Sequence, residues 1–587
     1  MSLEKKYLFG KLKFLWVLAV IFSFVVFVRL FHIQIINHKH YLEEAESNRT
    51  HVIYKVAPRG RIFTEDNVII ASNGPTFSLY YLPNARKNIK YLNELAEDIS
   101  KKINKNKDEI FASLKKANDT KRAVLLGDNL SPKSIYTYAE LKDAIPNIEF
   151  IENTKRFYPF DNMASHLIGF IGVIDKKDWQ DQYIKSNYRY DNKIGQSGIE
   201  KRFEKYLKGR DGGVFLEIDS KGRVKNIMQS RSWRPGADVH LTLNHKLQQV
   251  AEEGLKKSIS GLGAVVVMNP QNGKILAIAS APSYDLNKFV SYYDENPSGY
   301  VNTGIMEYNL AVKGLYPPAS VFKILVSIAA LENNIINKED EVLCKGSLWL
   351  GNREFGCWKT HGKTNFWDAL KHSCDVYFYT LAQKMGAFLI EKYQNKFHLS
   401  EPTYIDMEGE KASYTFGPKE RFDRKGYWYA GDNLNMCIGQ GELLITPIKM
   451  AQFISAVANG GKLWKPYYVD KIVSQNGKTL FAEKEKLLGD AKIKPETKQI
   501  MDKALKNVVD AGTGWAVNMR GVDVMGKTGT AQNPHGEDHG WFVAYANLPD
   551  EEPEIVVVVF VQHGKSGSSG AGPVARKILN EYFKDRV

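Results

Sequence analysis

The sequence predicts a multi-domain α+β protein: an N-terminal transmembrane helix, then an elongated domain of mixed short elements, then a C-terminal domain with an antiparallel sheet flanked by helices. The first observation is size, since 587 residues, 43% hydrophobic and 25% charged, suffice for two or more full-sized cores. The second is one long apolar run near the N-terminus. The third is a pair of strand groups, at 263–280 and 539–564, separated by a mostly helical region.

The apolar run "FLWVLAVIFSFVVFV", Phe14 to Val28, contains one serine as its only polar residue and continues past Arg29. Such a run reaches the roughly 20 residues needed to cross a bilayer, so we expect a transmembrane helix at 14–36. Four lysines precede it, which places residues 1–13 in the cytoplasm and the rest of the chain outside. A cleaved signal peptide is the alternative, but no small-residue cleavage site follows the run.

The net charge of +14 suits an anionic partner. No nucleic-acid-binding motif accompanies this charge, and an anchored exterior domain argues against DNA. The expected neighbour is therefore a polymer or lipid surface outside the membrane, and no nucleic acid.

After the membrane segment, the sequence predicts a domain boundary at Pro235-Gly236, where the composition and the pattern of apolar residues change. Residues 37–235 are rich in Lys, Asn and Tyr and carry no enzymatic signature, which predicts a non-catalytic pedestal. Residues 236–587 contain the strand groups: "GAVVVMNPQNGKILAIAS" at 263–280 is typical of a hairpin with an Asn/Gly turn. A closing helix is expected at 573–586.

A serine and a lysine lie three residues apart in "YPPASVFK", residues 316–323. The two prolines favour a helix start there, and the apolar residues after Lys323 indicate a buried helix. At this spacing the Ser320 hydroxyl and the Lys323 amine lie on one face, about one turn apart. A lysine in an apolar site can accept a serine proton. The alternative is an N-capping serine beside an exposed lysine, because Ser-x-x-Lys also occurs elsewhere in the chain.

Two further motifs weigh against that alternative. Ser373-Cys374-Asp375 lies in "HSCDVYFY", and Lys527-Thr528-Gly529 is the only Lys-Thr-Gly in the chain. The pattern Ser-x-Asp/Asn also occurs at Ser283 and Ser474, so it is the less specific of the two motifs. Lys-Thr-Gly is more specific, because a glycine in a strand permits close approach of a substrate or another backbone.

In this order the three motifs resemble those of the class B penicillin-binding proteins, most closely the cell-elongation type. The similarity extends to "PRGRIF" (58–63), "RFYPFDNMASHLIGFIG" (156–172), "GQSGIEKRFEKYLKGRDGG" (195–213) and "CIGQGELLITP" (437–447). Two departures stand out: "TEDNV" replaces a common Asp-Arg-Asn-Gly turn, and Asp375 replaces an asparagine found in many members. The first lies outside the catalytic region, and the second is common in elongation-type members.

The resemblance implies acyl transfer through a covalent serine intermediate on the penicillin-binding transpeptidase (serine β-lactamase-like) fold. Ser320 would attack a stem-peptide D-alanine carbonyl, Lys323 would accept its proton and Ser373 would relay a proton to the leaving amine. Lys527 would help to keep Lys323 neutral. The backbone N–H groups of Ser320 and Thr530 would form the oxyanion hole. The implied catalytic residues are Ser320, Lys323, Ser373, Asp375 and Lys527, and the implied substrate-binding residues are Thr528, Gly529 and Thr530.

Three of the four cysteines lie with one histidine in a short window: Cys344, Cys357, His361 and Cys374. A Cys3His set suits a structural zinc ion, and the resemblance also implies a metal site at these positions. In an oxidising compartment the alternative is a disulfide between two of the cysteines. Since Cys374 lies inside the Ser-x-Asp motif, metal loss should loosen Ser373. Cys437 is expected to be a small buried residue.

Three functional classes remain open at this stage: a cross-linking transpeptidase, a membrane-anchored β-lactamase or β-lactam sensor, and a catalytically idle structural subunit. A long pedestal and a retained anchor disfavour the second, and three intact motifs disfavour the third. The resemblance further implies peptidoglycan stem peptides as substrates and β-lactams as inhibitors. It also implies a RodA-type glycosyltransferase and an MreC-type scaffold as partners, at a bacterial inner membrane.

Overall fold

The structure is a computed structural model, and it describes residues 3–42, 50–82, 87–120, 123–131, 139–140, 145, 147–174, 188, 192–218, 224–295 and 307–587. The chain forms two compact units. The first comprises residues 1–58, 73–155 and 209–235, and the second comprises 59–72, 156–208 and 236–587. The main part of the second unit begins at Gly236, where the sequence texture changes, but 59–72 and 156–208 also belong to it, so the division is not linear along the chain.

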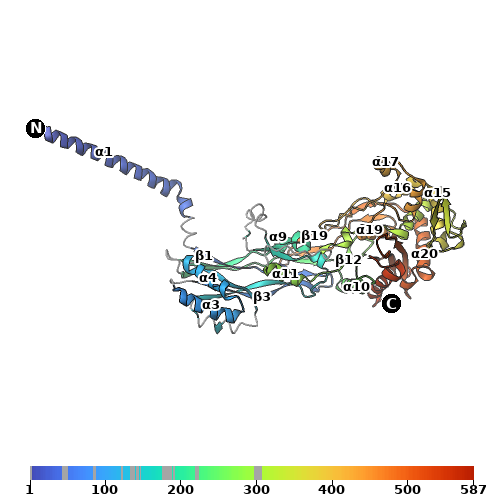
Figure 1. Cartoon of the computed structure of the whole chain (residues 1–587), viewed down its shortest axis with the longest axis horizontal. Coiled ribbons are helices and arrows are strands. Elements are labelled where there is room, and N and C mark those ends of the chain that lie inside the picture. The colour runs from blue at the N-terminus through green and yellow to red at the C-terminus, as the bar shows by residue number, and fades with distance from the viewer. Residues whose placement is uncertain are drawn as a thin grey trace. The chain divides into compact units, whose positions relative to one another are not determined.

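One long helix precedes the first folded domain. The α-helix α1 (Leu3–Phe31) continues into a π-helical turn, η1 (His32–Ile36). Over Leu12–Ile36 this segment is long and apolar enough to cross a membrane, with a mean hydropathy of 2.6, and none of its most apolar stretch is buried by the rest of the chain. This agrees with the transmembrane helix expected at 14–36; Figure 1 labels it.

The first unit is a mixed domain. One antiparallel sheet has the order β1-β8-β9. The later part of β3 (Phe77–Tyr81) pairs with β4, and β5 also pairs with β3. Two amphipathic helices cover these strands, and Leu92, Ile99 and Leu114 lie in their common core. The elements that lie wholly or mainly in this unit are β1 (Thr50–Lys55), β3 (Ile69–Tyr81), α3 (Ile89–Ile103), α4 (Lys107–Thr120), β4 (Val124–Leu130), β5 (Ile148–Phe157), β8 (Gly212–Ile218) and β9 (Val224–Arg231).

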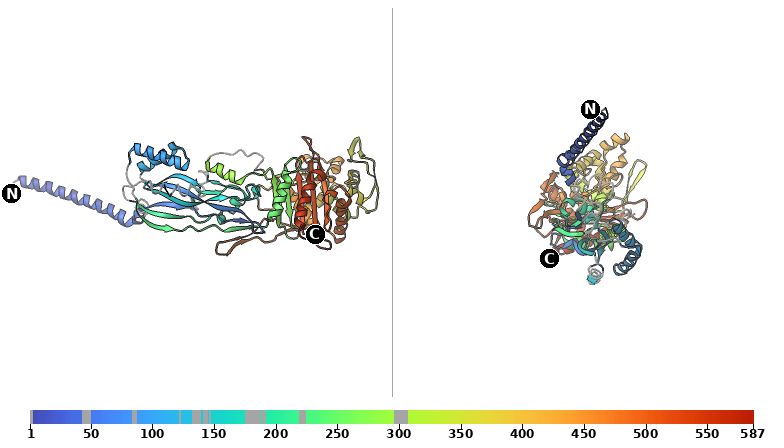
Figure 2. Two further views of the ribbon diagram at one scale, coloured as in Figure 1. Left: turned by 90° about the horizontal axis from the view of Figure 1, so that it is seen from below. Right: turned by 90° about the vertical axis from the view of Figure 1, so that its left-hand side faces the viewer.

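The second unit is built on a five-stranded sheet of order β12-β11-β23-β22-β21, in which every neighbouring pair is antiparallel. Its strands are β11 (Gly263–Met268), β12 (Ile275–Ala281), β21 (Asp523–Ala531), β22 (His539–Asn547) and β23 (Ile555–Val561). β11 and β12 form the predicted hairpin, and β11 pairs with β23 from the other end of the sequence. Figure 2 shows the red C-terminal strands beside the green strands. The predicted sheet from both chain ends is therefore confirmed.

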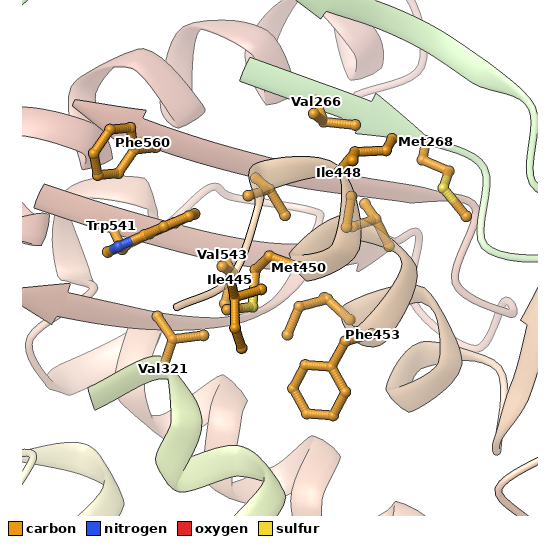
Figure 3. Close-up of a cluster of buried hydrophobic side chains, with 14 of the residues drawn as sticks. Val266, Met268, Val321, Ile445, Ile448, Met450, Phe453, Trp541, Val543 and Phe560 are labelled. Carbon is orange, nitrogen blue, oxygen red and sulfur yellow. The ribbon is translucent and has the colours of Figure 1, made fainter. Parts of the chain in front are cut away.

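Both faces of this sheet are buried, which is why its strands are almost continuously apolar. Val265 and Val557 face helices α10 (His245–Lys256) and α21 (Gly572–Phe583). The alternating residues Val266 and Val558 face the opposite core. Figure 3 shows that second face, where Ile448, Met450 and Phe453 of α19 (Pro447–Ala458) approach Val266, Met268 and Val543. Antiparallel strands place successive side chains on opposite faces, so one sheet supports two helical layers.

Helices and small hairpins fill the segment between the strand groups. The remaining elements of this unit are β2 (Ile62–Phe63), α6 (Ser165–Ile168), β6 (Ile171–Val173), β7 (Lys193–Gly195), α8 (Gly198–Arg202), α9 (Glu204–Leu207), β10 (Asp238–Leu241), α11 (Leu286–Glu295), α12 (Leu310–Lys313), η6 (Ala319–Phe322), α13 (Lys323–Glu332), β13 (Val342–Cys344), β14 (Ser347–Leu350), β15 (Arg353–Gly356), β16 (Gly362–Thr364), α14 (Phe366–Lys371), α15 (Asp375–Met385), α16 (Ala387–Lys396), α17 (Pro418–Lys425), α18 (Ala430–Cys437), β17 (Lys462–Trp464), β18 (Val469–Val473), β19 (Thr479–Ala482), β20 (Leu487–Asp490), α20 (Pro495–Ala511), η7 (Trp515–Val517) and η8 (Gly567–Ala571).

A buried ionic cluster joins the early segments 59–72 and 156–208 of this unit to one another. The Glu200 carboxylate is fully buried and accepts hydrogen bonds from Arg156 Nε at 2.6 Å and from Arg59 Nε at 3.0 Å. Tyr158 donates to the same carboxylate at 3.3 Å. These residues come from three of the motifs that resemble the family, so those motifs have a packing role: each supplies one member of a buried charge network.

Candidate active site

The serine of the first motif lies in a tight turn at the mouth of a buried helix. Ala319–Phe322 form the 3-10 turn η6, and α13 begins at Lys323. Ala319 has a φ of +50°, an unfavourable conformation for a residue with a Cβ. Its N–H donates to Gly439 O at 2.9 Å. Gly439 itself has a φ of +72°, and a Cβ there would lie 2.2 Å from Ala319 O, so glycine is required to hold the turn.

Lys323 contacts both Ser373 and Asp375 of the second motif. Its side chain is completely buried, and its Nζ donates to Asp375 Oδ1 at 2.7 Å. The same Nζ donates to Ser373 O at 3.0 Å and contacts Ser373 Oγ at 3.2 Å. Asp375 is thus the carboxylate partner of the buried Lys323 amine. An exposed lysine beside an N-capping serine is thereby excluded.

Ser373 is held in a strained turn between α14 and α15. It has a φ of +55°, and its N–H donates to Leu370 O at 3.3 Å. Strained backbone of this kind persists only where its surroundings over-determine it, and it is concentrated at functional sites. The turn aims the Ser373 hydroxyl at both lysines.

Lys527 comes from the edge strand β21 and is also completely buried. Its Nζ lies 3.0 Å from Ser373 Oγ and donates to Thr528 O at 3.2 Å. Burial and the nearby charge of Lys323 hold the pKa of Lys527 well below its usual range. The resemblance implied that Lys323 is the neutral amine, but in this state Lys323 has the carboxylate partner and Lys527 is driven towards neutrality.

Ser320 is half-buried, and within the described part of the chain its hydroxyl makes no hydrogen bond. The Lys323 amine therefore makes its hydrogen bonds to Ser373 and Asp375 and none to the Ser320 hydroxyl. Hydrogen bonds of catalytic groups often tighten only when substrate is bound.

The Lys-Thr-Gly strand runs directly beside the nucleophile turn. A Cβ on Gly529 would lie 3.0 Å from Val321 Cγ2 and 3.1 Å from Pro318 O, so this glycine permits the close approach. The Thr530 side chain is exposed, and Thr528 is largely buried. The sequence analysis missed Thr513, whose hydroxyl lies 2.7 Å from the Thr528 hydroxyl. Its only signal was the Gly-Thr-Gly turn after an amphipathic helix.

The cysteine and histidine side chains converge as the spacing predicted. The ligand atoms of Cys344, Cys357, His361 and Cys374 all lie within 4.8 Å of one another. His361 Nδ1 lies 3.5 Å from Cys357 Sγ and 3.6 Å from Cys344 Sγ. Cys357 Sγ also accepts the Asp375 N–H at 3.2 Å, so the cluster is bonded directly to a candidate catalytic residue. Cys437 is buried elsewhere, with its Sγ on Phe378 O and Leu434 O.

A cavity of about 660 Å³ in the same unit is lined by none of these groups. Two ion pairs border it, Lys201 with Glu408 at 2.8 Å and Arg202 with Asp406 at 2.7 Å. These four charges are therefore paired with one another, and the catalytic candidates belong to a separate site.

A serine at a strained turn, two buried lysines bridged by a second serine hydroxyl, and an antiparallel sheet between helices define a serine acyl-transfer enzyme scaffold. Residues 263–580 match the penicillin-binding protein transpeptidase domain, and residues 54–241 match the penicillin-binding protein dimerisation domain. The chain belongs to the penicillin-binding protein family.

Within this family the chain is similar to peptidoglycan D,D-transpeptidase MrdA of Haemophilus influenzae, with 31% identity over 96% of this chain and 90% of that protein. The MrdA of Acinetobacter baumannii is 28% identical over 99% of this chain and 89% of that protein. Among solved structures, the complex of penicillin-binding protein PBP2 with MreC from Helicobacter pylori has a TM-score of 0.74 at 26% identity, covering 92% of this chain and 99% of that one.

Proposed function

We propose that this protein is a peptidoglycan D,D-transpeptidase of the cell-elongation type, which cross-links stem peptides through an acyl-enzyme on Ser320. The observation that carries the proposal is the Ser373 hydroxyl, which lies 3.2 Å from Lys323 Nζ and 3.0 Å from Lys527 Nζ. The names of the MrdA relatives support the same activity.

The proposed reaction has two acyl transfers. Ser320 Oγ bonds to the carbonyl carbon of the penultimate D-alanine, the C–N bond to the terminal D-alanine breaks, and its amine leaves with a proton delivered through Ser373. The Ser320 proton goes to Lys323. In the second transfer the amine of another stem peptide attacks the ester, and Ser320 regains its proton.

The charges of the two lysines suggest how the base becomes neutral. Before substrate binds, Lys323 is the ammonium paired with Asp375, and the amine of Lys527 is disfavoured as a cation by burial and by Lys323. A substrate carboxylate beside Lys527 reverses that preference. Lys323 then gives a proton to Ser373 Oγ while Ser373 gives its own to Lys527, which leaves a neutral Lys323 next to Ser320.

The donor strand is proposed to bind along β21. Lys527, Thr528 and Thr530 would hold the terminal carboxylate by charge-assisted hydrogen bonds, and Gly529 lets the peptide lie close to the nucleophile turn. The backbone N–H groups of Ser320 and Thr530 would stabilise the oxyanion, each contributing about 3 kcal/mol.

The Cys3His cluster is proposed to hold a structural Zn²⁺. The donor set fits: three thiols and an imidazole suit tetrahedral zinc, whose Zn–S distance of about 2.3 Å places neighbouring ligands within roughly 4 Å of one another. When bound, the ion would cross-link the hairpin segments to the start of α15. The Cys357 Sγ contact with the Asp375 N–H would then help to place Asp375 beside Lys323.

The proposed setting is a bacterial inner membrane, with residues 1–13 cytoplasmic, a single span at 14–36, a pedestal in 37–235 and the catalytic domain, 236–587, in the periplasm. The apolar helix and the lysines before it support this orientation. The Helicobacter pylori relative was solved with MreC, which supports an MreC-type scaffold as a partner. A RodA-type glycosyltransferase remains a prediction from the family.

Labelled penicillin tests the activity. The penicillin label on a transpeptidase should be released only slowly. Ser320→Ala should abolish the label, and Ser327→Ala, on the helix that follows the Ser320 turn, should retain it. A donor pentapeptide with an acceptor amine should yield a cross-linked product. Rapid release of hydrolysed drug would identify a β-lactamase, and no labelling of the native protein would identify an idle subunit.

Elemental analysis tests the metal site. About one equivalent of zinc per chain is expected, with loss on Cys357→Ser and retention on Cys437→Ser, a cysteine outside the cluster. Less than half an equivalent, together with a disulfide between two cluster cysteines, would falsify the zinc assignment.

A further inference from the structure

The loop that follows α20 contacts both the turn that carries Ser373 and the strand β21 that carries Lys527. Gly512 ends the helix, and the Thr513 N–H donates to Lys371 O at 3.2 Å. Lys371 is the last residue of α14, two residues before Ser373. A Cβ on Gly512 would lie 2.5 Å from Lys371 O, so the glycine is what allows this approach. One end of Thr513 is thereby attached to the turn that carries Ser373.

The side chain of Thr513 contacts strand β21. Its Oγ1 lies 2.7 Å from Thr528 Oγ1. Thr528 follows Lys527, whose Nζ contacts Ser373 Oγ at 3.0 Å. The contacts therefore close a ring that runs from Thr513 through Lys371 to Ser373, across to Lys527, and back through Thr528. None of the three sequence motifs contains Thr513.

The hydroxyl pair has a defined hydrogen-bond direction when substrate is bound. Each hydroxyl has one proton to donate. If Thr528 donates its proton to the substrate carboxylate, the 2.7 Å contact must be a hydrogen bond from Thr513 to Thr528 Oγ1. Thr513 then holds the Thr528 hydroxyl in one rotamer and polarises it towards the carboxylate.

We propose that Thr513 is a positioning residue of the donor carboxylate subsite, which orients the Thr528 hydroxyl and fixes strand β21 against the Ser373 turn. This inference rests on the proposed function, because that function assigns Thr528 to the carboxylate. It adds a residue that acts through Thr528 and does not touch the reacting atoms.

The test compares a penicillin that carries its free carboxylate with the methyl ester of the same penicillin. Acylation of the full-length protein is measured over a range of concentrations, which separates the binding constant from the limiting rate. Thr513→Val should weaken binding of the acid by roughly 3- to 10-fold, the worth of one hydrogen bond. The acid-to-ester preference should fall by the same factor, and Thr513→Ser should restore most of it.

A double-mutant cycle supplies the second readout. If Thr513 acts through Thr528, Thr513→Val should cost nothing further once Thr528 is Val. Thr497→Val, at a threonine near the start of α20, is the control for a methyl-for-hydroxyl change and should leave the acid-to-ester preference at the native value. The acid-to-ester preference is a ratio measured within one variant. A lower amount of folded Thr513→Val protein therefore does not change it, and the test remains valid.

The outcomes separate the two proposals. Failure of native protein to be acylated by the acid would overturn the proposed function itself. Normal acylation of native protein, with an unchanged acid-to-ester preference in Thr513→Val or with additive losses in the double variant, would overturn only the role of Thr513.

Discussion

Lys323 and Asp375 form an ion pair with a distance of 2.7 Å between Nζ and Oδ1, and the lysine side chain has no exposure to solvent. Asp375 also acts on the second lysine: its charge opposes the lowering of the pKa of Lys527 that burial and the charge of Lys323 cause.

Asp375→Asn should consequently move the base-dependent limb of the acylation rate to lower pH, because the pKa of Lys527 falls further without the Asp375 charge. This part of the pH–rate profile reports one apparent pKa that belongs to the coupled lysine pair. The rate of penicillin acylation, measured as a function of pH, gives that apparent pKa. Asp368→Asn, on the preceding helix, is the control and should leave the limb in place. An unshifted limb in Asp375→Asn would show that the ion pair does not govern the base.

Ser373→Ala removes the only hydroxyl that bridges the two lysines within the described residues. Loss of this proton path should slow acylation by about 100-fold or more, while the thermal unfolding temperature stays close to the native one. Ser327→Ala is a matched control, since Ser327 is also buried and its Oγ has no partner in the described chain. Equal rates for the two variants would remove Ser373 from the mechanism.

Gly439→Ala should damage the nucleophile turn. Alanine at a positive φ costs about 1–2 kcal/mol by itself, and here its Cβ would also lie 2.2 Å from Ala319 O. The clash should add about 1–3 kcal/mol and sharply reduce penicillin labelling. Gly460 has a similar φ of +84° with nothing within 4 Å, so Gly460→Ala isolates the backbone contribution. Denaturant unfolding and labelling of both variants check the prediction.

Glu252 should make the second unit less stable as pH rises. Burial raises the pKa of this carboxyl from 4.5 to about 7, although it accepts hydrogen bonds from Ala164 N at 2.6 Å and Gln248 Nε2 at 2.7 Å. Between these values the folded state binds more protons than the unfolded state, so the free energy of unfolding falls through this window. The full effect is about 3 kcal/mol at most.

Glu252→Gln should flatten this pH dependence and stabilise the protein above pH 7, because an amide oxygen can accept the same two hydrogen bonds without charge. Unfolding curves at pH 5 and pH 8 measure it. Glu253→Gln changes an exposed neighbour and should preserve the native slope; if both variants keep that slope, the carboxyl of Glu252 is not the source.

The Glu200 cluster should be a stability determinant. Glu200→Ala would leave the buried Arg156 guanidinium without its carboxylate and Arg59 with Glu204 alone, at a cost of about 3–5 kcal/mol. Lys201→Ala, which breaks an exposed pair with Glu408, should cost less than about 1 kcal/mol. Chemical unfolding measures the free energy of unfolding of the Glu200→Ala and Lys201→Ala variants. Similar losses of stability in the two would contradict a structural role for the buried cluster.

Much of the fold followed from local pattern. The hairpin at 263–280, the apolar strand at 555–561 and the closing helix after Gly572 were visible because strand and helix periodicities, turn residues and apolar runs are local properties. The three catalytic motifs were visible for the same reason. The assignment of 59–72 and 156–208 to the second unit was not, because it depends on contacts such as the pairing of Ile62 with Val239 and the bond from the Ala164 N–H to Glu252, whose partners are far apart in the chain.

The sequence by itself determined the residue types and the order of the chemistry: a serine and a lysine one turn apart, a Ser-x-Asp turn, a Lys-Thr-Gly strand and a Cys3His window. Only the tertiary structure decided how these groups share protons and space. It pairs Lys323 with Asp375, bridges both lysines through Ser373, sets Gly439 against Ala319 and brings Thr513 to Thr528. The physical reason is that burial and charge proximity depend on which segments meet in space, and the spacing of residues along the sequence does not encode either.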